Sequence, residues 1–118
     1  MSRKKPAAPP SPQALPPPDP PVICEAWPGA AGSVIRGRLI DFEEAVARRR
    51  AGFDVVVCGN NLSLNRAMAS RIELAANGAY LRHTPHASAG PNALPHVQPV
   101  SRPPEGHTFY ETSHRRAR

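Results

Sequence analysis

The sequence predicts a small single domain of mixed helix and strand, of the α+β or α/β class. Two observations support this fold class. Helical patterns over 42–51 and from 62 to 76 alternate with apolar, β-branched stretches over 33–40, 53–58 and 79–83. A proline-rich stretch over 84–104 then precedes a last apolar segment over 106–112. The expected order is β-α-β-α-β, a long His- and Pro-rich loop, and a final strand.

The first helix has a clear start signal. The strand expected over 33–40 reads Ser-Val-Ile-Arg-Gly-Arg-Leu-Ile, and Asp41 follows it as a helix N-cap. Glu44, three positions on, completes a capping box. Gly52 should stop this helix, and the apolar run 53–58 suits a strand that is covered on both faces. At least two strands should be parallel and joined by right-handed crossovers.

The second helix should begin at the turn Gly59-Asn60-Asn61 and close at Asn77-Gly78. A glycine followed by two amides at a helix start also suits anion binding, although capping alone would explain these residues. Arg49 and Arg71 fall within the apolar stripes of the two helices. Each should therefore carry its stem along the edge of the core or reach into a cleft.

The proline distribution sets the expected domain boundaries. The chain has 118 residues, enough for one domain, and residues 1–21 hold nine of its 16 prolines. Such a segment cannot bury enough apolar surface to order, so 1–21 should be a disordered arm. The domain is expected over 22–112, and the Arg-rich end 113–118 is expected to fray.

Targeting signals are not evident in the sequence. Proline replaces the apolar centre of a secretory signal peptide, and no apolar run reaches the roughly 18 residues of a transmembrane helix. We therefore expect a cytoplasmic protein, or one delivered to the cytoplasm of a target cell by a non-classical route.

The charge balance favours an anionic partner. The formal net charge is +6, from 15 Lys and Arg against 9 Asp and Glu. Nucleic acid, an acidic protein or a membrane surface would fit this excess, as would a simple solvated basic surface. Cys24 and Cys58 are too few for a disulfide scaffold, and Cys58 should be a small buried hydrophobe.

Histidines mark the candidate site. Four of the 5 histidines punctuate the proline-rich segment, at His83, His86, His96 and His107. Histidine exchanges protons near neutral pH, and its neutral ring is also a common metal ligand. Structural zinc sites usually pair two short Cys or His knuckles, whereas here a single knuckle, His83-x-x-His86, has Pro85 inside it. Zinc is therefore the weaker alternative, and no cofactor or metal ligand is assigned.

Metal-free RNA cleavage is the favoured chemistry. Transesterification needs a base for the 2′-hydroxyl proton, an acid for the leaving oxygen, and donors for the phosphate; two histidines can do the first two tasks. We predict that His86, His96 and His107 are catalytic. The expected substrate-binding residues are Arg82, Asn92, Arg102, Thr108 and Tyr110, the arginines serving as phosphate clamps.

A short segment also carries a family resemblance. Pro85-His86, Pro95-His96 and Gly106-His107-Thr108-Phe109-Tyr110 form a run of spaced histidines and prolines that ends in Gly-His-x-Phe-Tyr. This run, within residues 85–110, resembles the C-terminal toxin tips of bacterial polymorphic toxins, in which small basic nuclease domains end a long delivery protein. The resemblance implies a cytotoxic effector, an RNase, neutralised in its producer by an immunity protein.

The sequence thus predicts a small basic toxin-type effector that cleaves RNA by histidine acid–base catalysis. The alternative is a non-enzymatic interaction module, in which the proline-rich arm and basic tail recruit partners and the loop histidines are incidental. Geometry separates these readings. Convergence of ring nitrogens beside a phosphate-sized cleft favours the enzyme, rings pointing apart favour the interaction module, and tetrahedral convergence of three favours zinc.

Overall fold

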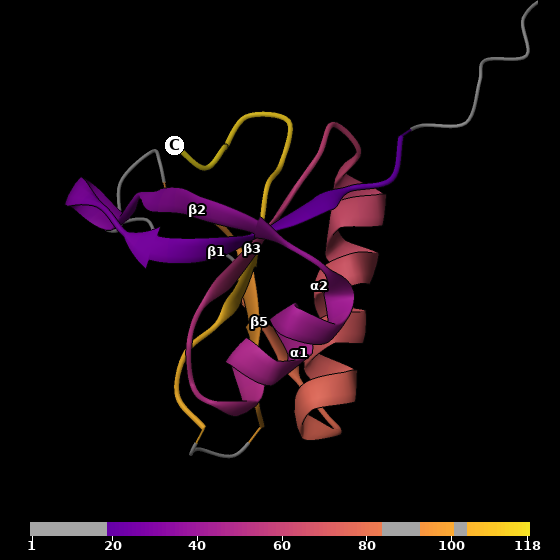
Figure 1. Cartoon of the computed structure of the whole chain (residues 1–118). Helices are drawn as coiled ribbons and strands as arrows, with labels where there is room; N and C mark the ends of the chain where they lie inside the picture. The colour runs from indigo at the N-terminus through magenta and orange to yellow at the C-terminus, as the bar shows by residue number, and fades with distance from the viewer. Residues whose placement is uncertain (1–18, 84–92, 101–103) are drawn as a thin grey trace, which may run out of the picture.

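The computed structural model describes residues 19–83, 93–100 and 104–118 (Figure 1). Within these ranges, six strands form one mixed sheet that carries two α-helices, which confirms the α+β class. The elements are β1 (Val22–Pro28), the 3-10 turn η1 (Ala30–Gly32), β2 (Val34–Ile40), α1 (Phe42–Arg50), β3 (Val55–Cys58), α2 (Leu62–Asn77), β4 (Leu81–His83), β5 (His96–Gln98) and β6 (Thr108–Tyr110).

The strand order is β2-β1-β3-β6-β5-β4. β3 and β6 pair in parallel, whereas β1 is antiparallel to β2 and β3, and β5 is antiparallel to β6 and β4. It follows that β2, β3 and β4 all run in one direction, as expected for strands that alternate with helices. They are not neighbours, because β1 lies between β2 and β3, and β6 and β5 lie between β3 and β4.

Both helices begin at the residues that the sequence predicts. Asp41 Oδ1 accepts a hydrogen bond from Glu44 N at 2.8 Å, and Asn61 Oδ1 accepts one from Leu64 N at 2.9 Å. Each cap satisfies an amide that has no partner inside its helix. α2 ends at Gly78, whose φ of 80° lies in the left-handed region that glycine adopts without strain.

Two strands occur where the sequence predicts none. β1 carries no alternating pattern, yet it pairs with β2 on one side and β3 on the other. The prediction that 84–104 contains no regular structure is wrong for β5. Pro95 and Pro99 flank this strand without interrupting it, so its three residues keep the backbone donors that pairing requires.

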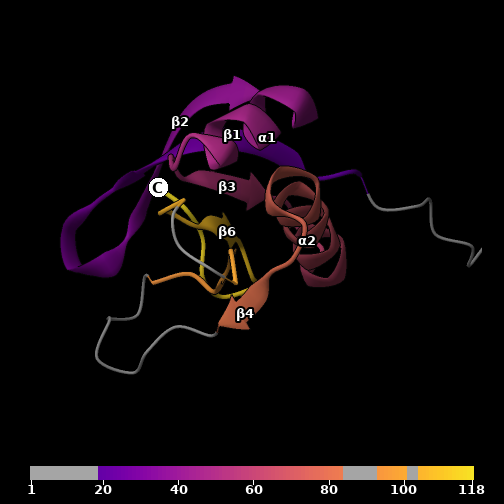
Figure 2. The same ribbon diagram turned by 90° about the horizontal axis from the view of Figure 1, so that it is seen from below.

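The sheet has two buried faces. The helix face lies under α1 and α2, and its core includes Ile23, Val57 and Val97. The second face holds Cys24, Val56 and Leu94, and Ala117, from the end of the chain, packs against it. Figure 2 shows α2 on one side of β3 and β6 and the yellow end of the chain on the other.

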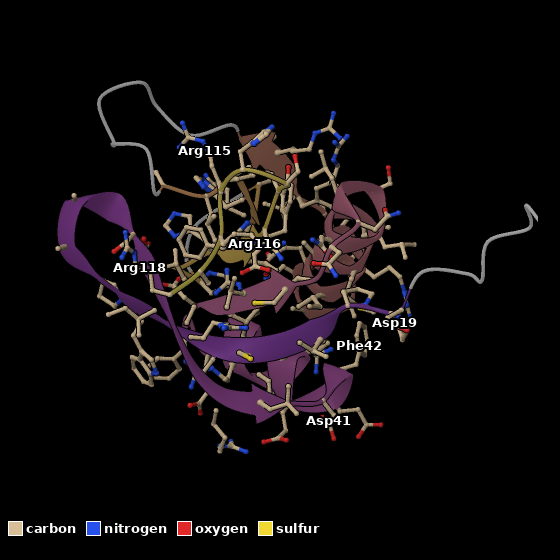
Figure 3. All side chains as sticks on the ribbon, turned by 90° about the horizontal axis from the view of Figure 1, so that it is seen from above. Asp19, Asp41, Phe42, Arg115, Arg116 and Arg118 are labelled. Atoms are coloured by element: carbon tan, nitrogen blue, oxygen red, sulfur yellow. The ribbon has the colours of Figure 1, made fainter. Side chains whose placement is uncertain are left out.

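The Arg-rich end does not fray as the sequence suggests. Arg118 N donates to Val34 O at 2.7 Å, and Arg36 N donates to Arg118 O at 2.8 Å, so the end pairs with β2. Ala117 N donates to the buried carboxylate of Glu111 at 2.8 Å. In Figure 3 this yellow segment carries the labelled Arg115, Arg116 and Arg118, with Arg118 beside the purple β1–β2 hairpin.

A buried ion pair joins the two helices on the helix face. Arg49 is fully buried, unlike the edge or cleft position expected for it, and its Nε lies 2.5 Å from Glu73 Oε2. Arg49 Nη1 donates to Phe53 O at 2.9 Å and to Glu105 O at 3.0 Å. Thr108 Oγ1 donates to Glu73 Oε2 at 2.8 Å, which extends the network to β6.

Arg71, by contrast, extends along the edge of the core, its guanidinium 5.1 Å from the centre of the Phe42 ring. No helix in the described ranges combines the length and apolar character that crossing a membrane requires.

Candidate functional site

Two of the three histidines predicted to be catalytic lie in contact. The ring centroids of His96 and His107 are 4.5 Å apart, in an edge-to-face arrangement. Strand pairing explains the contact: His96 of β5 lies opposite Phe109 of β6, and His107 precedes Phe109 by two residues, so the three side chains share the second face. Phe109 borders both rings, at 5.6 Å from His96 and 5.3 Å from His107.

Asp54 is the acidic partner of His107, and sequence analysis did not select it. Its Oδ1 accepts a hydrogen bond from His107 N at 2.7 Å and lies 3.6 Å from His107 Nδ1. Burial opposes ionisation of this carboxyl, but the hydrogen bonds and charge of His107 outweigh burial and lower the pKa of Asp54. An ionised Asp54 beside Nδ1 favours the tautomer with its proton on Nδ1 and leaves Nε2 as the basic nitrogen.

The residue directly before His107, Gly106, has to be a glycine. Its φ is 93°, and a Cβ at this position would lie 2.6 Å from Arg49 Nη1 and 3.0 Å from Asp54 Oδ1. Only a residue without a side chain lets the backbone pass this closely. The Gly-His pair of the sequence motif is therefore a geometric requirement of the Asp54–His107 contact.

His96 has a different neighbour. Its Nε2 lies 3.2 Å from Gln98 Oε1, an acceptor, which favours a proton on that nitrogen. The two rings thus face opposite kinds of partner: Asp54 favours an unprotonated Nε2 on His107, and Gln98 favours a protonated Nε2 on His96. The side chain of His107 is 31% exposed, so it can meet a substrate.

The other residues predicted for the site do not all lie on the same face as the histidine pair. In the register of the sheet, His83 of β4 is paired with His96 of β5. Arg82 lies opposite Val97, on the helix face, as do Thr108 and Tyr110. Three of the five expected substrate-binding residues therefore lie on the face away from the histidine pair. His86, Asn92 and Arg102 lie outside the described residues.

Thr108 is a core residue. It is fully buried, and its hydroxyl donates to Glu73 inside the ion-pair network. Within the described part of the chain, no three His, Cys, Asp or Glu side chains are grouped so that they could hold a metal ion. The knuckle His83-x-x-His86 lies outside the part of the chain whose side chains the structure describes.

The Gly59-Asn60-Asn61 turn binds a carboxylate of the chain itself. Gly59 N donates to Glu111 Oε1 at 3.1 Å, and Arg116 Nη1 and Nη2 donate to Gly59 O at 2.7 Å and to Asn60 Oδ1 at 2.8 Å. The turn that suits an anion is thus occupied by Glu111, whose role is to fasten the end of the chain to the sheet.

Neither cysteine offers a nucleophile. Cys24 and Cys58 are buried free thiols, as expected for Cys58. Burial first, and then the negative charge of Glu111, raises the pKa of Cys58 to about 12. Because the thiolate is the reactive form, this thiol is inert near neutral pH.

Comparisons of the chain with protein-family models, with curated proteins and with solved structures found no match. The function therefore has to be inferred from the chemistry of these side chains.

Proposed function

We propose that this chain is a small basic toxin-type effector domain that cleaves RNA, with His96 and His107 as its acid–base pair. The observation that carries the proposal is the contact between two imidazoles with oppositely biased ring nitrogens. The net charge of +6 supports a polyanionic substrate.

In this proposal His107 is the general base. Its Nε2 takes the proton of a ribose 2′-hydroxyl, and the 2′-oxygen attacks the adjacent phosphorus to form a 2′,3′-cyclic phosphate. The bond from phosphorus to the 5′-oxygen breaks, and protonated His96 gives its proton to that oxygen. Exchange with water then restores both rings. Because the rings touch, the phosphate lies against their exposed edges and not between them.

Asp54 is a positioning residue in this scheme. It fixes the tautomer of His107 and stabilises the imidazolium that forms when His107 takes a proton. Its ionised state, favoured by the lowered pKa, suits that role near neutral pH.

The resemblance of residues 85–110 to toxin tips adds two parts to the proposal. The domain acts in the cytoplasm of a target cell, reached by a non-classical route, and its producer is protected by an immunity protein. Bacterial expression tests this directly: the wild-type chain should slow growth, and the double variant His96→Ala/His107→Ala should not.

The enzymatic test is degradation of total RNA by purified variants. His96→Ala and His107→Ala should each slow cleavage by at least about 100-fold, the usual contribution of one acid or base. Leu39→Ala, at an exposed position of β2, is the matched control and should retain the wild-type rate. Circular dichroism must show that all variants fold. If both histidine variants fold and cleave like the wild type, the catalytic assignment fails.

A second candidate function is the non-enzymatic interaction module. The observation that favours it is an exposed aromatic pair, Trp27 at 44% and Phe53 at 53% exposure. The guanidinium of Arg48 lies 5.2 Å and 5.3 Å from the centres of these two rings. Trp and Arg side chains are typical of protein-binding hot spots. A wild-type chain that cleaves no RNA would favour this function.

A further inference from the structure

A cavity at the start of α2 is lined by basic side chains and is separate from the histidine pair. Its volume is about 290 Å³, and it lies between the first turns of α2, Pro95 and the chain after β6. Arg66, His114 and Arg115 line it, and none of its described lining residues is acidic. We propose that this α2-start pocket binds a phosphoryl group, a function that does not depend on RNA cleavage.

Arg66 provides the strongest argument. It lines the pocket from α2, and its Nε is shielded from solvent with no hydrogen-bond partner among the described residues. Leaving a buried donor unsatisfied costs about 1–3 kcal/mol. If the guanidinium turns towards an oxyanion in the pocket, Nε gains the missing acceptor, and the planar group matches two oxygens of a phosphoryl group.

Tyr110 adds a neutral donor to the same pocket. The residue is 4% exposed, and burial raises the pKa of its phenol, although the positive charges of Arg66 and Arg82 and a hydrogen bond with Arg66 oppose the rise. The hydroxyl is therefore protonated near neutral pH and lies beside Arg66, where it can donate to an oxyanion.

A turn after β6 holds the other two basic side chains at the pocket. Thr112 N donates to Arg115 O at 2.9 Å, and Thr112 Oγ1 accepts from the amides of His114 and Arg115 at 3.2 Å and 2.9 Å. Arg115 Nη1 donates to Ala93 O at 2.7 Å. These hydrogen bonds fix the positive charge of Arg115 beside the cavity.

The two helix starts differ in charge. The first turn of α1 carries Glu43 and Glu44, which offset the positive end of its dipole, whereas the first turn of α2 contains no acidic residue. An anion in the α2-start pocket would therefore also be favoured by the dipole of a 16-residue helix.

The phosphoryl group could belong to a free phosphorylated small molecule or to a strand of RNA. Tyr110 lies on the helix face and the histidine pair lies on the second face. If RNA binds, the phosphate in the pocket would therefore be a different phosphate from the one at the cleaved bond. The chemistry that recognises the group is the same in both cases.

Calorimetric titration tests the pocket with three probes: inorganic phosphate, a nucleoside 3′-monophosphate, and a single-stranded RNA oligonucleotide. The oligonucleotide is added to chains that also carry His96→Ala and His107→Ala, so that it is not cleaved. Arg66→Gln and Arg115→Gln should each weaken phosphate binding at least about tenfold, equivalent to 1.4 kcal/mol. Arg71→Gln, on the same helix but over the Phe42 ring, should bind within about twofold of the wild type.

The titration with RNA shows whether the phosphoryl group comes from RNA or from a small molecule. If RNA occupies the pocket, Arg66→Gln should reduce the slope of log affinity against log salt by about 0.7, the value for one lost contact to a single strand. If the monophosphates bind but this slope does not change, the natural ligand is a small molecule. If Arg66→Gln does not fold, Tyr110→Phe, which keeps the ring, should still weaken phosphate binding.

Wild-type affinity for all three probes in both Arg66→Gln and Arg115→Gln would overturn the inference, as would no binding of any probe to the wild type. The result is separable from the proposed function. Phosphate binding without RNA cleavage would support the phosphoryl-binding pocket and contradict the proposed nuclease activity. RNA cleavage without phosphate binding would support the nuclease activity and contradict the pocket.

Discussion

The two faces of the sheet are sealed in different ways. The helix face is covered by α1 and α2, whose apolar stripes are local patterns of the sequence. The second face is covered in part by irregular chain, which Glu111 fastens to the Gly59 turn. Both covers exclude water, since Val57 on the helix face and Val56 on the second face are each 0% exposed. Only the second face carries the contacting histidines, which suggests that irregular cover leaves room for reactive side chains at its border.

The largest effect is expected on the helix face, at Glu73. Glu73→Gln leaves the charge of Arg49 unpaired in the core, which should lower the free energy of unfolding by about 3–5 kcal/mol in urea denaturation. The double variant Arg49→Met/Glu73→Leu removes both charges and should recover most of this loss. A loss below about 1 kcal/mol in Glu73→Gln would contradict the assignment of a tightly coupled pair.

On the second face, the buried carboxylate that corresponds to Glu73 is Glu111, which holds the end of the chain against the sheet. Glu111→Ala leaves the amides of Gly59 and Ala117 without an acceptor and should cost about 2–3 kcal/mol of unfolding free energy. It should also speed modification of Cys58 by a thiol reagent, because the end of the chain loosens and the charge that helps to raise the pKa of this thiol is lost. Unchanged labelling of Cys58 would show that the cover does not depend on Glu111.

Much of the fold could be predicted because its signals are local. Asp41 and Glu44 mark the start of one helix within four residues, and Asn61 marks the other. β1 and β5 could not be found this way, because neither carries a local pattern and both depend on pairing: β1 with the adjacent β2 and the distant β3, and β5 with β4 and β6. Asp54 was missed for the same reason: its contact with His107 spans 53 residues and depends on the parallel pairing of β3 with β6.

The contact between His96 and His107 could be anticipated only as a hypothesis. The spacing of histidines shows a shared segment, but the meeting of the two rings requires that β5 and β6 pair in this register. The end of the chain misled sequence analysis, because its arginines suggest a solvated tail while its fixed position comes from Glu111 and β2.

Neighbouring valines of β3 give the most direct comparison of the two faces. Val56→Ala and Val57→Ala remove the same atoms from opposite faces, and each should cost about 1.5 kcal/mol, from about 0.8 per methylene. Equal losses in urea denaturation would mean that irregular chain packs as well as helices do. A clearly smaller loss for Val56→Ala would mean that the second face is looser.

The smallest expected effect concerns pH and Asp54. Because folding lowers the pKa of this carboxyl, its contribution to stability is present above the unfolded value of about 3.9 and is lost as pH falls through the folded value. The urea midpoints of wild type and Asp54→Asn should therefore differ most near pH 7 and converge in acid. A difference that stays constant with pH would show that Asp54 is not the titrating group.

The position of β6 has a consequence for biosynthesis. This strand joins β2-β1-β3 to β5-β4, yet it is the last of the six to emerge from the ribosome. Until it docks, a nascent polypeptide exposes the open edges of β3 and β5, which makes it a natural client for chaperones. The imidazole pair also cannot assemble before that moment, so the proposed acid–base chemistry is absent during translation.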